Sequence, residues 1–191
     1  AILEHGELAF AHGFGTQGVG SAEPVDAATM FRIGSMSKLL TAIGVMSAAE
    51  DGLLDIDAPL REVIPDLSLS DPEVEELSVR RLLSQQTGLG DFLEIEAPTD
   101  DGALADFAEG PELPASVSFV NPPGVFWNYS NPNYYLAGRA LEVATSQPYR
   151  LVMDERVFTP LGMQRSYWLP SEVIADGNYT HGYGVMDVLG L

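Results

Sequence analysis

The only lysine in the chain, Lys38, lies three residues after a serine, Ser35. Residues three apart share one face of a helix, so this spacing would place the ammonium group within reach of the hydroxyl. A serine hydroxyl is a weak nucleophile until a neighbouring base takes its proton, and a lysine can be that base when burial lowers its pKa. The pair therefore indicates nucleophilic catalysis, with the N–H groups at the start of a helix available to stabilise an oxyanion.

A second polar group, Tyr129-Ser130-Asn131, follows a Pro-Pro-Gly turn and directly precedes a predicted helix, so its side chains can project into a cleft. This second group matters because the chain has many serines, and a Ser-x-x-Lys spacing alone is a weak signal. Ser37 and Ser130 are the competing nucleophiles. Ser37 would point away from Lys38 by helix geometry, and Ser130 has no base at a fixed spacing.

The element that must position Ser35 is a predicted helix over residues 29–52, which we expect to be largely buried. Its apolar positions form a broad face: Met36, Leu39, Leu40, Ile43, Val45 and Met46. An apolar setting for Lys38 would come from four flanking side chains: Phe31, Ile33, Met36 and Leu39.

The rest of the chain is predicted to be mostly helical. Helices are expected over residues 78–88, 132–143 and 149–158. Ser78 opens the first and Gly88 closes it, and Pro160 and Gly162 end the last. Alternating apolar and polar residues around a turn predict a β-hairpin over residues 3–15. The acidic, proline-containing stretch over residues 94–114 is expected to be an exposed loop.

This order of elements predicts an α+β protein with two parts. Residues 1–28 would form the N-terminal β-hairpin of a sheet, and residues 29–191 a mainly helical region with the Ser-x-x-Lys and Tyr-x-Asn motifs. The sheet is under-supplied with strands, which indicates that further strands belong to it.

The composition excludes several classes of function. The chain has 191 residues and no cysteine, which excludes thiolate nucleophiles and disulfides. Its formal net charge of −19 argues against nucleic acid as a partner. No apolar run is long enough for a membrane span, and the N-terminus lacks the pattern of a signal peptide. The three histidines are widely separated and the acidic residues do not have the spacing of a calcium loop, so we expect no metal.

Four segments of the chain resemble successive landmarks of one known family. FRIGSMSKLLTA, LLSQQTGL, PPGVFWNYSNPNYYLAGRALE and FTPLGMQRSYW are similar to those of class C β-lactamases, D-alanyl-D-alanine carboxypeptidases and β-lactamase-like esterases and peptidases. The resemblance spans nearly all of the chain. It implies a β-lactamase/transpeptidase-like fold with a helical domain and part of an antiparallel sheet.

The resemblance also implies roles for four residues. Ser35 would be the acylated nucleophile and Lys38 the lysine of its motif. Tyr129 would exchange protons with the nucleophile and the leaving group, and Asn131 would bind the lysine and the substrate's amide. No cofactor is implied, and a periplasmic or secreted location is favoured by the resemblance.

The chain departs from the family pattern at two points. The family has a histidine where this sequence has Gln85 or Gln86, in LLSQQTGL. The family's third motif, Lys-Thr-Gly or His-x-Gly on a strand, is expected beyond the end of this sequence, and His181 is not assigned to it. We therefore expect the C-terminal strands to be missing from this chain. Three explanations are open: the chain is a fragment, the remainder of the protein lies outside this sequence, or the protein is cleaved and a complementing C-terminal chain of the same protein supplies the strands. We favour the last, because a sheet reduced to one hairpin exposes an unpaired edge.

These observations favour a serine hydrolase that acts through an acyl-enzyme on an ester, a peptide or a β-lactam, with an esterase or peptidase preferred. One alternative is a catalytically silent binding or scaffold protein that kept the fold. Another is an assembly-forming protein that self-associates through its acidic surface and open sheet edge.

Overall fold

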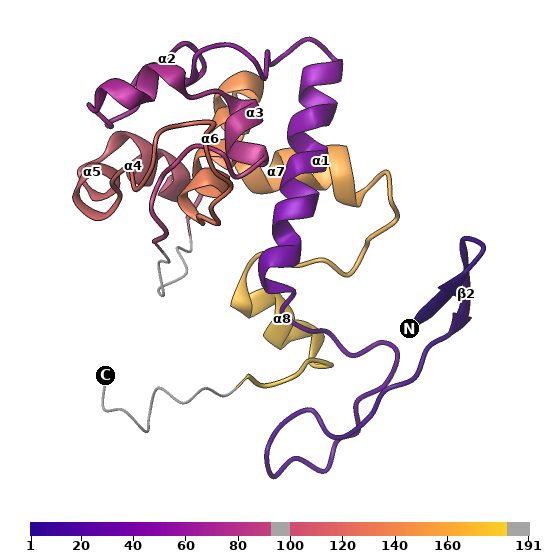
Figure 1. Cartoon of the computed structure of the whole chain (residues 1–191). Coiled ribbons are helices and arrows are strands. Elements are labelled where there is room, and N and C mark those ends of the chain that lie inside the picture. The colour runs from indigo at the N-terminus through magenta and orange to yellow at the C-terminus, as the bar shows by residue number, and fades with distance from the viewer. Residues whose placement is uncertain (93–99, 183–191) are drawn as a thin grey trace. The chain divides into compact units, whose positions relative to one another are not determined.

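The computed structural model describes residues 1–92 and 100–182 and contains two compact units. One unit combines Ala1–Gly34 with Tyr167–Leu191, and the other is Ser35–Ser166. Figure 1 traces the chain through both. From the sequence we expected a domain boundary after residue 28, and this boundary stays a prediction.

The N-terminal part of the first unit is the predicted β-hairpin. Strands β1 (Ile2–Glu4) and β2 (Glu7–Phe10) pair antiparallel. The turn between them places His5 at φ 53° and Gly6 at φ 83°, a conformation for which glycine is well suited. Four large apolar side chains of these two strands are exposed in the described chain: Ile2, Leu3, Leu8 and Phe10.

The same unit contains a short helix that the sequence did not lead us to expect, α8 (Pro170–Asp176). Proline in its first turn suits a helix start, and Gly177 ends it in the left-handed conformation. Glu172 accepts hydrogen bonds from the backbone N–H groups of Trp168 and Leu169, at 3.1 and 2.9 Å, and so caps its N-terminus.

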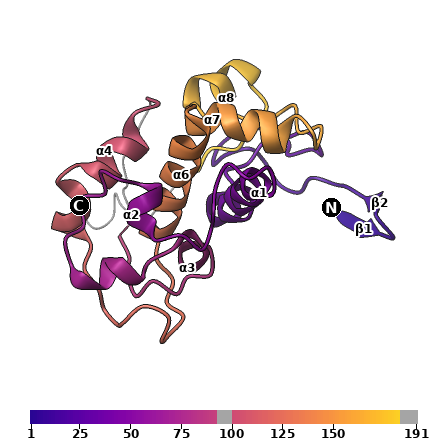
Figure 2. The ribbon, with the colours of Figure 1, turned by 90° about the horizontal axis from the view of Figure 1, so that it is seen from above.

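The regular elements among the described residues of the second unit are all helical. Its elements are η1 (Gly34–Met36, which begins one residue earlier), α1 (Ser37–Glu50), α2 (Leu60–Val63), η2 (Pro72–Glu76), α3 (Val79–Leu83), α4 (Ala103–Glu109), α5 (Glu112–Ser116), α6 (Pro132–Thr145), α7 (Tyr149–Met153) and the π-helical turn η3 (Asp154–Phe158). Helix α6 is the centre of this unit, since α1, α2, α3, α4 and α7 all contact it. Figure 2 looks nearly along α1 and shows α6 beside it.

Small residues let α1 approach α6 and α7 closely. A Cβ added to Gly44 would lie 2.8 Å from the sulfur of Met153 and 3.4 Å from a methyl group of Leu141. Val45 and Ala48 of the same helix are fully buried. Part of the core of the unit therefore lies between α1 and its neighbours α6 and α7, and this packing holds α1 in place.

Two expectations about α1 were wrong. The helix begins at Ser37 after a single turn at residues 34–36 rather than at residue 29, because Gly34 has φ 51°, outside the right-handed helical region. The broad apolar face is also largely exposed: Met36 is 69% exposed and Leu39 65%, and Ile43 and Met46 are exposed too. The buried side of α1 is instead the one that contains its small residues.

The expectation of an exposed loop over residues 94–114 was wrong in its described part, while residues 93–99 lie outside the described residues. Helices α4 and α5 occupy this region. The ring of Phe107 is buried and packs edge-on against Tyr135, with centroids 5.2 Å apart, and Glu109 pairs with Arg139 at 2.6 Å. The acidic composition did not indicate these helices, because they bury only a few apolar side chains.

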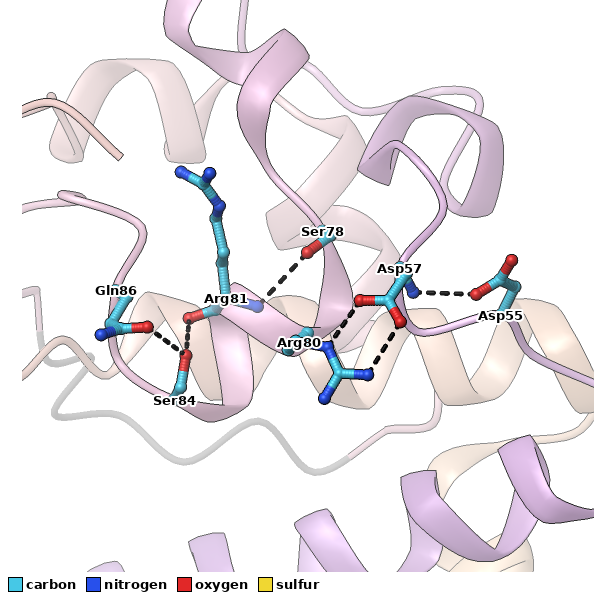
Figure 3. A network of polar contacts seen from close by, with 7 residues as sticks. All are labelled: Asp55, Asp57, Ser78, Arg80, Arg81, Ser84 and Gln86. Carbon is cyan, nitrogen blue, oxygen red and sulfur yellow. Dashed lines mark hydrogen bonds and ion pairs between the residues drawn. The ribbon is translucent and has the colours of Figure 1, made fainter. Parts of the chain in front are cut away.

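Helix α3 begins where the sequence predicted and ends earlier. The Ser78 side chain accepts a hydrogen bond from the backbone N–H of Arg81 at 3.4 Å and caps the helix (Figure 3). Arg80 makes a two-bond ion pair with Asp57 at 2.5 and 2.8 Å, which lowers the pKa of the Asp57 carboxyl through the hydrogen bonds from Arg80. The helix stops at Leu83 because the chain turns at Gln85, whose φ is 58°.

Candidate active site

Ser35 and Lys38 lie on one face of the turn that opens α1, as their spacing predicted. Ser35 belongs to η1 and Lys38 to the first turn of α1. The Lys38 ammonium nitrogen donates a hydrogen bond to Ser35 Oγ at 3.2 Å. Ser35 is exposed and Lys38 is half-buried, so the hydroxyl is open to a ligand while the amine is held against the protein.

Tyr129 completes a triangle with this pair. Its phenolic oxygen lies 2.6 Å from Ser35 Oγ and 2.5 Å from Lys38 Nζ. The residue comes from the extended segment before α6, and the packing of α6 against α1 sets this distance. The Ser35 hydroxyl therefore has two groups within hydrogen-bonding reach that can take its proton.

Asn131 provides the fourth member of the cluster. Its Oδ1 accepts a hydrogen bond from Lys38 Nζ at 2.7 Å, so all three N–H donors of the ammonium group have an acceptor. We call Ser35, Lys38, Tyr129 and Asn131 the Ser35 cluster. The Tyr134 ring centroid lies 5.7 Å from Lys38 Nζ, close enough for a weak cation–π attraction.

The surroundings of Tyr129 favour its ionised form. The hydrogen bond from Lys38 is the largest cause that lowers the pKa of its phenol, and the hydrogen bond with Ser35 adds to it. Desolvation and the negative charge of Asp91 act in the opposite direction but do not cancel the effect. Tyr129 can therefore carry a negative charge at a lower pH than an ordinary tyrosine.

A buried polar network holds the segment that contains Tyr129. The Gln85 side chain accepts hydrogen bonds from the backbone N–H of Ser130 at 3.0 Å and from Asn133 Nδ2 at 2.6 Å. Asn133 in turn accepts from Thr87 Oγ1 at 2.6 Å. Because Gln85, Ser130, Thr87 and Asn133 are all buried, loss of one partner would leave others unsatisfied.

The structure also places the two glutamines that depart from the family pattern and the two serines that compete with Ser35 as nucleophiles. Gln85 points into this network, whereas the Gln86 side chain is exposed and accepts a hydrogen bond from Ser84 at 3.2 Å (Figure 3). Ser130 is fully buried and donates to the Gly90 carbonyl at 3.1 Å, which makes it a poor nucleophile. The backbone carbonyl of Ser37 accepts a hydrogen bond from Thr41 Oγ1 at 3.0 Å within α1.

Sequence reasoning missed Asp91. Its Oδ1 accepts hydrogen bonds from the backbone N–H of Asn131 at 2.8 Å and from Asn131 Nδ2 at 3.0 Å. The two residues are forty positions apart, and no spacing rule connects them. The only available signal was the position of Asp91 just after the LLSQQTGL segment.

Solved structures share this fold. The octameric penicillin-binding protein homologue from Pyrococcus abyssi superimposes with a TM-score of 0.78 and 27% sequence identity, over 95% of this chain and 42% of that one. The predicted α+β, penicillin-binding-protein-like fold is therefore confirmed.

The chain belongs to the Beta-lactamase family, whose family model matches residues 1–188. It is 32% identical to penicillin-binding protein 4 of Amycolatopsis lactamdurans, over 91% of this chain and 45% of that protein. It is 30% identical to esterase EstB of Burkholderia gladioli, over 90% of this chain and 46% of that protein. The chain thus spans about half the length of these curated relatives.

No helix among the described residues is long and apolar enough to cross a membrane.

Proposed function

We propose that this chain carries the acylation centre of a serine hydrolase, with Ser35 as the nucleophile. The observation that supports this most directly is that Ser35 Oγ lies 2.6 Å from the Tyr129 hydroxyl and 3.2 Å from Lys38 Nζ. A nucleophile beside a base that is itself oriented by a third group is the arrangement that covalent catalysis needs.

The geometry supports the following steps. Tyr129 in its ionised form, or Lys38 in its neutral form, accepts the Ser35 proton as Oγ bonds to a carbonyl carbon. The carbonyl oxygen becomes an oxyanion, which the N–H groups at the start of α1 help to stabilise. Tyr129 then donates a proton to the leaving group as the bond from that group to carbon breaks; this is either the proton that it took from Ser35 or its own, which Lys38 replaces through their hydrogen bond. Water repeats the sequence on the acyl-enzyme and releases Ser35.

Asn131 is proposed to bind both Lys38 and the substrate. Its Oδ1 is engaged by Lys38, and its Nδ2 gives one N–H to Asp91. An amide nitrogen has two N–H donors, so among the contacts of the described residues one remains for a substrate carbonyl. This agrees with the role that the sequence resemblance implies.

The substrate is an ester, a peptide or a β-lactam, since each presents a carbonyl to the same nucleophile. Relatives include proteins named as a penicillin-binding protein and as an esterase. Within this range we favour an ester or a peptide, as the sequence resemblance is to the broad group.

We further propose that a C-terminal segment or second chain of the same protein completes the activity. The chain spans 45% and 46% of two curated relatives. Among the described residues the sheet has two strands, and both expose large apolar side chains. Three or more strands with a covered apolar face are the usual requirement for a stable sheet. The added segment would cover these strands.

The test is a denaturing intact-mass spectrum after incubation with a fluorophosphonate, a reagent that phosphonylates activated serines. We expect one adduct on the native chain and none on Ser35→Ala. Ser37→Ala is the matched control, since it removes a hydroxyl two residues away and should keep the adduct. No adduct on the native protein, with any complementing chain present, would favour the catalytically silent binding role instead.

A further inference from the structure

Asn131 lies between two groups that make opposite demands on its side-chain amide. Lys38 Nζ, 2.7 Å from Oδ1, can only donate while it is charged. The Asp91 carboxylate, 3.0 Å from Nδ2, can only accept while it is ionised. Only one orientation of the amide satisfies both, with its oxygen toward the lysine and its nitrogen toward the aspartate.

The hydrogen bond between Lys38 and Asn131 could reverse its direction once Lys38 loses a proton. A neutral amine has a lone pair, so Lys38 would then accept an N–H of Asn131 if the amide turned over. That contact would occupy the lone pair that a base must use. The hydrogen bond to Asp91 is the contact that keeps the Asn131 N–H groups on the other side.

We infer that Asp91 is a positioning residue, which fixes the Asn131 side-chain amide with its oxygen toward Lys38. The inference rests on the proposed function of the Ser35 cluster and adds to it a residue outside the Ser-x-x-Lys and Tyr-x-Asn motifs.

The geometry at Asp91 supports this role in a second way. One carboxylate oxygen, Oδ1, accepts both hydrogen bonds, from the backbone N–H of Asn131 at 2.8 Å and from its side chain at 3.0 Å. Main chain and side chain of Asn131 are thus held by a single atom just before α6 begins. The Asp91 charge also raises the pKa of Tyr129, against the larger lowering by Lys38, and so makes the phenolate a stronger base.

Because a single oxygen accepts both bonds, charge and geometry can be separated by mutation. Asp91→Asn can keep an oxygen in the place of Oδ1 while it removes the charge and exchanges the second oxygen for an NH₂ group, whereas Asp91→Ala loses the acceptor. Asp66→Ala is the matched control, since it removes an exposed carboxylate elsewhere in the same unit.

The first measurement is the rate at which a fluorophosphonate modifies Ser35, followed by intact mass. We expect Asp91→Ala to be slower than the native chain by about tenfold, the order of a lost hydrogen bond near a charged group. Asp91→Asn should stay within about threefold, and Asp91→Ala should add almost nothing in an Asn131→Ala background, because coupled residues are not additive. A large further loss in that background, or a tenfold loss in Asp91→Asn, would overturn the inference.

The second measurement does not depend on activity. Lys38 is the only lysine, so labelling lysine with ¹³C at Cε gives one resonance that reports its surroundings. We expect Asp91→Ala to shift this resonance and Asp91→Asn to shift it less, with Asp66→Ala unchanged. If Asp91→Ala matches Asp66→Ala, the positioning role is refuted whether or not Ser35 reacts. A native chain that stays unmodified with any complementing chain present, but shows the expected shifts, would refute the proposed function alone.

Discussion

Replacing Tyr129 by phenylalanine removes one oxygen atom from the centre of the Ser35 cluster. That oxygen lies 2.6 Å from Ser35 Oγ and 2.5 Å from Lys38 Nζ, so the nucleophile loses its nearest proton acceptor. Lys38 remains 3.2 Å from Ser35 and can still act as a base. General acid–base groups typically contribute about 10²–10⁴-fold, and because a second base remains we expect a loss near the lower end, about a hundredfold.

The pH dependence of the modification rate should show the direction in which Lys38 shifts the pKa of Tyr129. The Lys38 hydrogen bond lowers the pKa of Tyr129, so the phenolate is present at lower pH than in an ordinary tyrosine. If the phenolate takes the Ser35 proton, the rate of modification rises with pH through the pKa of Tyr129. Lys38→Met removes the hydrogen bond that lowers this pKa, and it should move the rising limb to higher pH as well as reduce the maximum rate.

The assay is the pseudo-first-order rate of fluorophosphonate modification between about pH 6 and 11, a range that includes the pKa of about 10 of an unperturbed tyrosine. Tyr134→Phe is the matched control. It removes the same oxygen from a ring 5.7 Å from Lys38, but this hydroxyl donates to the Leu83 carbonyl, and burial raises the pKa of the Tyr134 phenol. A native rate in Tyr129→Phe, or an equal loss in both variants, would show that Tyr129 is not the proton acceptor.

Two further predictions concern the scaffold and are measured by chemical denaturation. Gln85→Ala leaves two buried donors without their acceptor and should lower the free energy of unfolding by about 1–3 kcal/mol for each group that finds no new partner, whereas Gln86→Ala, at an exposed position, should change it little. Gly88→Ala should destabilise more than Gly52→Ala, because both have positive φ but only at Gly88 would the new Cβ overlap a backbone carbonyl, that of Asn121. Equal effects within either pair would contradict the contacts on which these predictions rest.

The sequence predicted the Ser35 cluster because its chemistry is local. Ser35 and Lys38 are separated by less than one helical turn, and Tyr129 and Asn131 by two residues, so each pair is fixed by its own backbone. What the spacing could not supply is the meeting of the two pairs, more than ninety residues apart. The family resemblance supplied that link, and the structure brings all four side chains together.

The contacts that support the cluster could not be predicted in this way. Gln85 was noted only as a departure from a pattern, yet its side chain holds the backbone of Ser130 across forty-five positions. Asp91 had no distinguishing spacing at all. Such contacts depend on how two loops meet, which neither periodicity nor local propensity encodes.

The exposure of α1 was mispredicted for a related reason. An apolar stripe in a sequence indicates a face that something covers, but it does not indicate what covers it. Helix α1 packs on α6 and α7 through Gly44, Val45 and Ala48, and the described residues leave Met36 and Leu39 exposed. The exposed stripe is therefore consistent with the proposed C-terminal segment, although the exposed apolar side chains of β1 and β2 support that proposal more directly.

The same packing explains why the four side chains of the Ser35 cluster can meet within one unit. Ser35 and Lys38 lie at the start of α1, Tyr129 and Asn131 lie just before α6, and these two helices contact each other directly. The distances from Ser35 to the groups proposed as its bases thus depend on the packing of α1 on α6, in which Gly44 permits the close approach. A larger residue at Gly44 would force α1 away from its neighbours, so it should slow Ser35 modification without touching any member of the cluster.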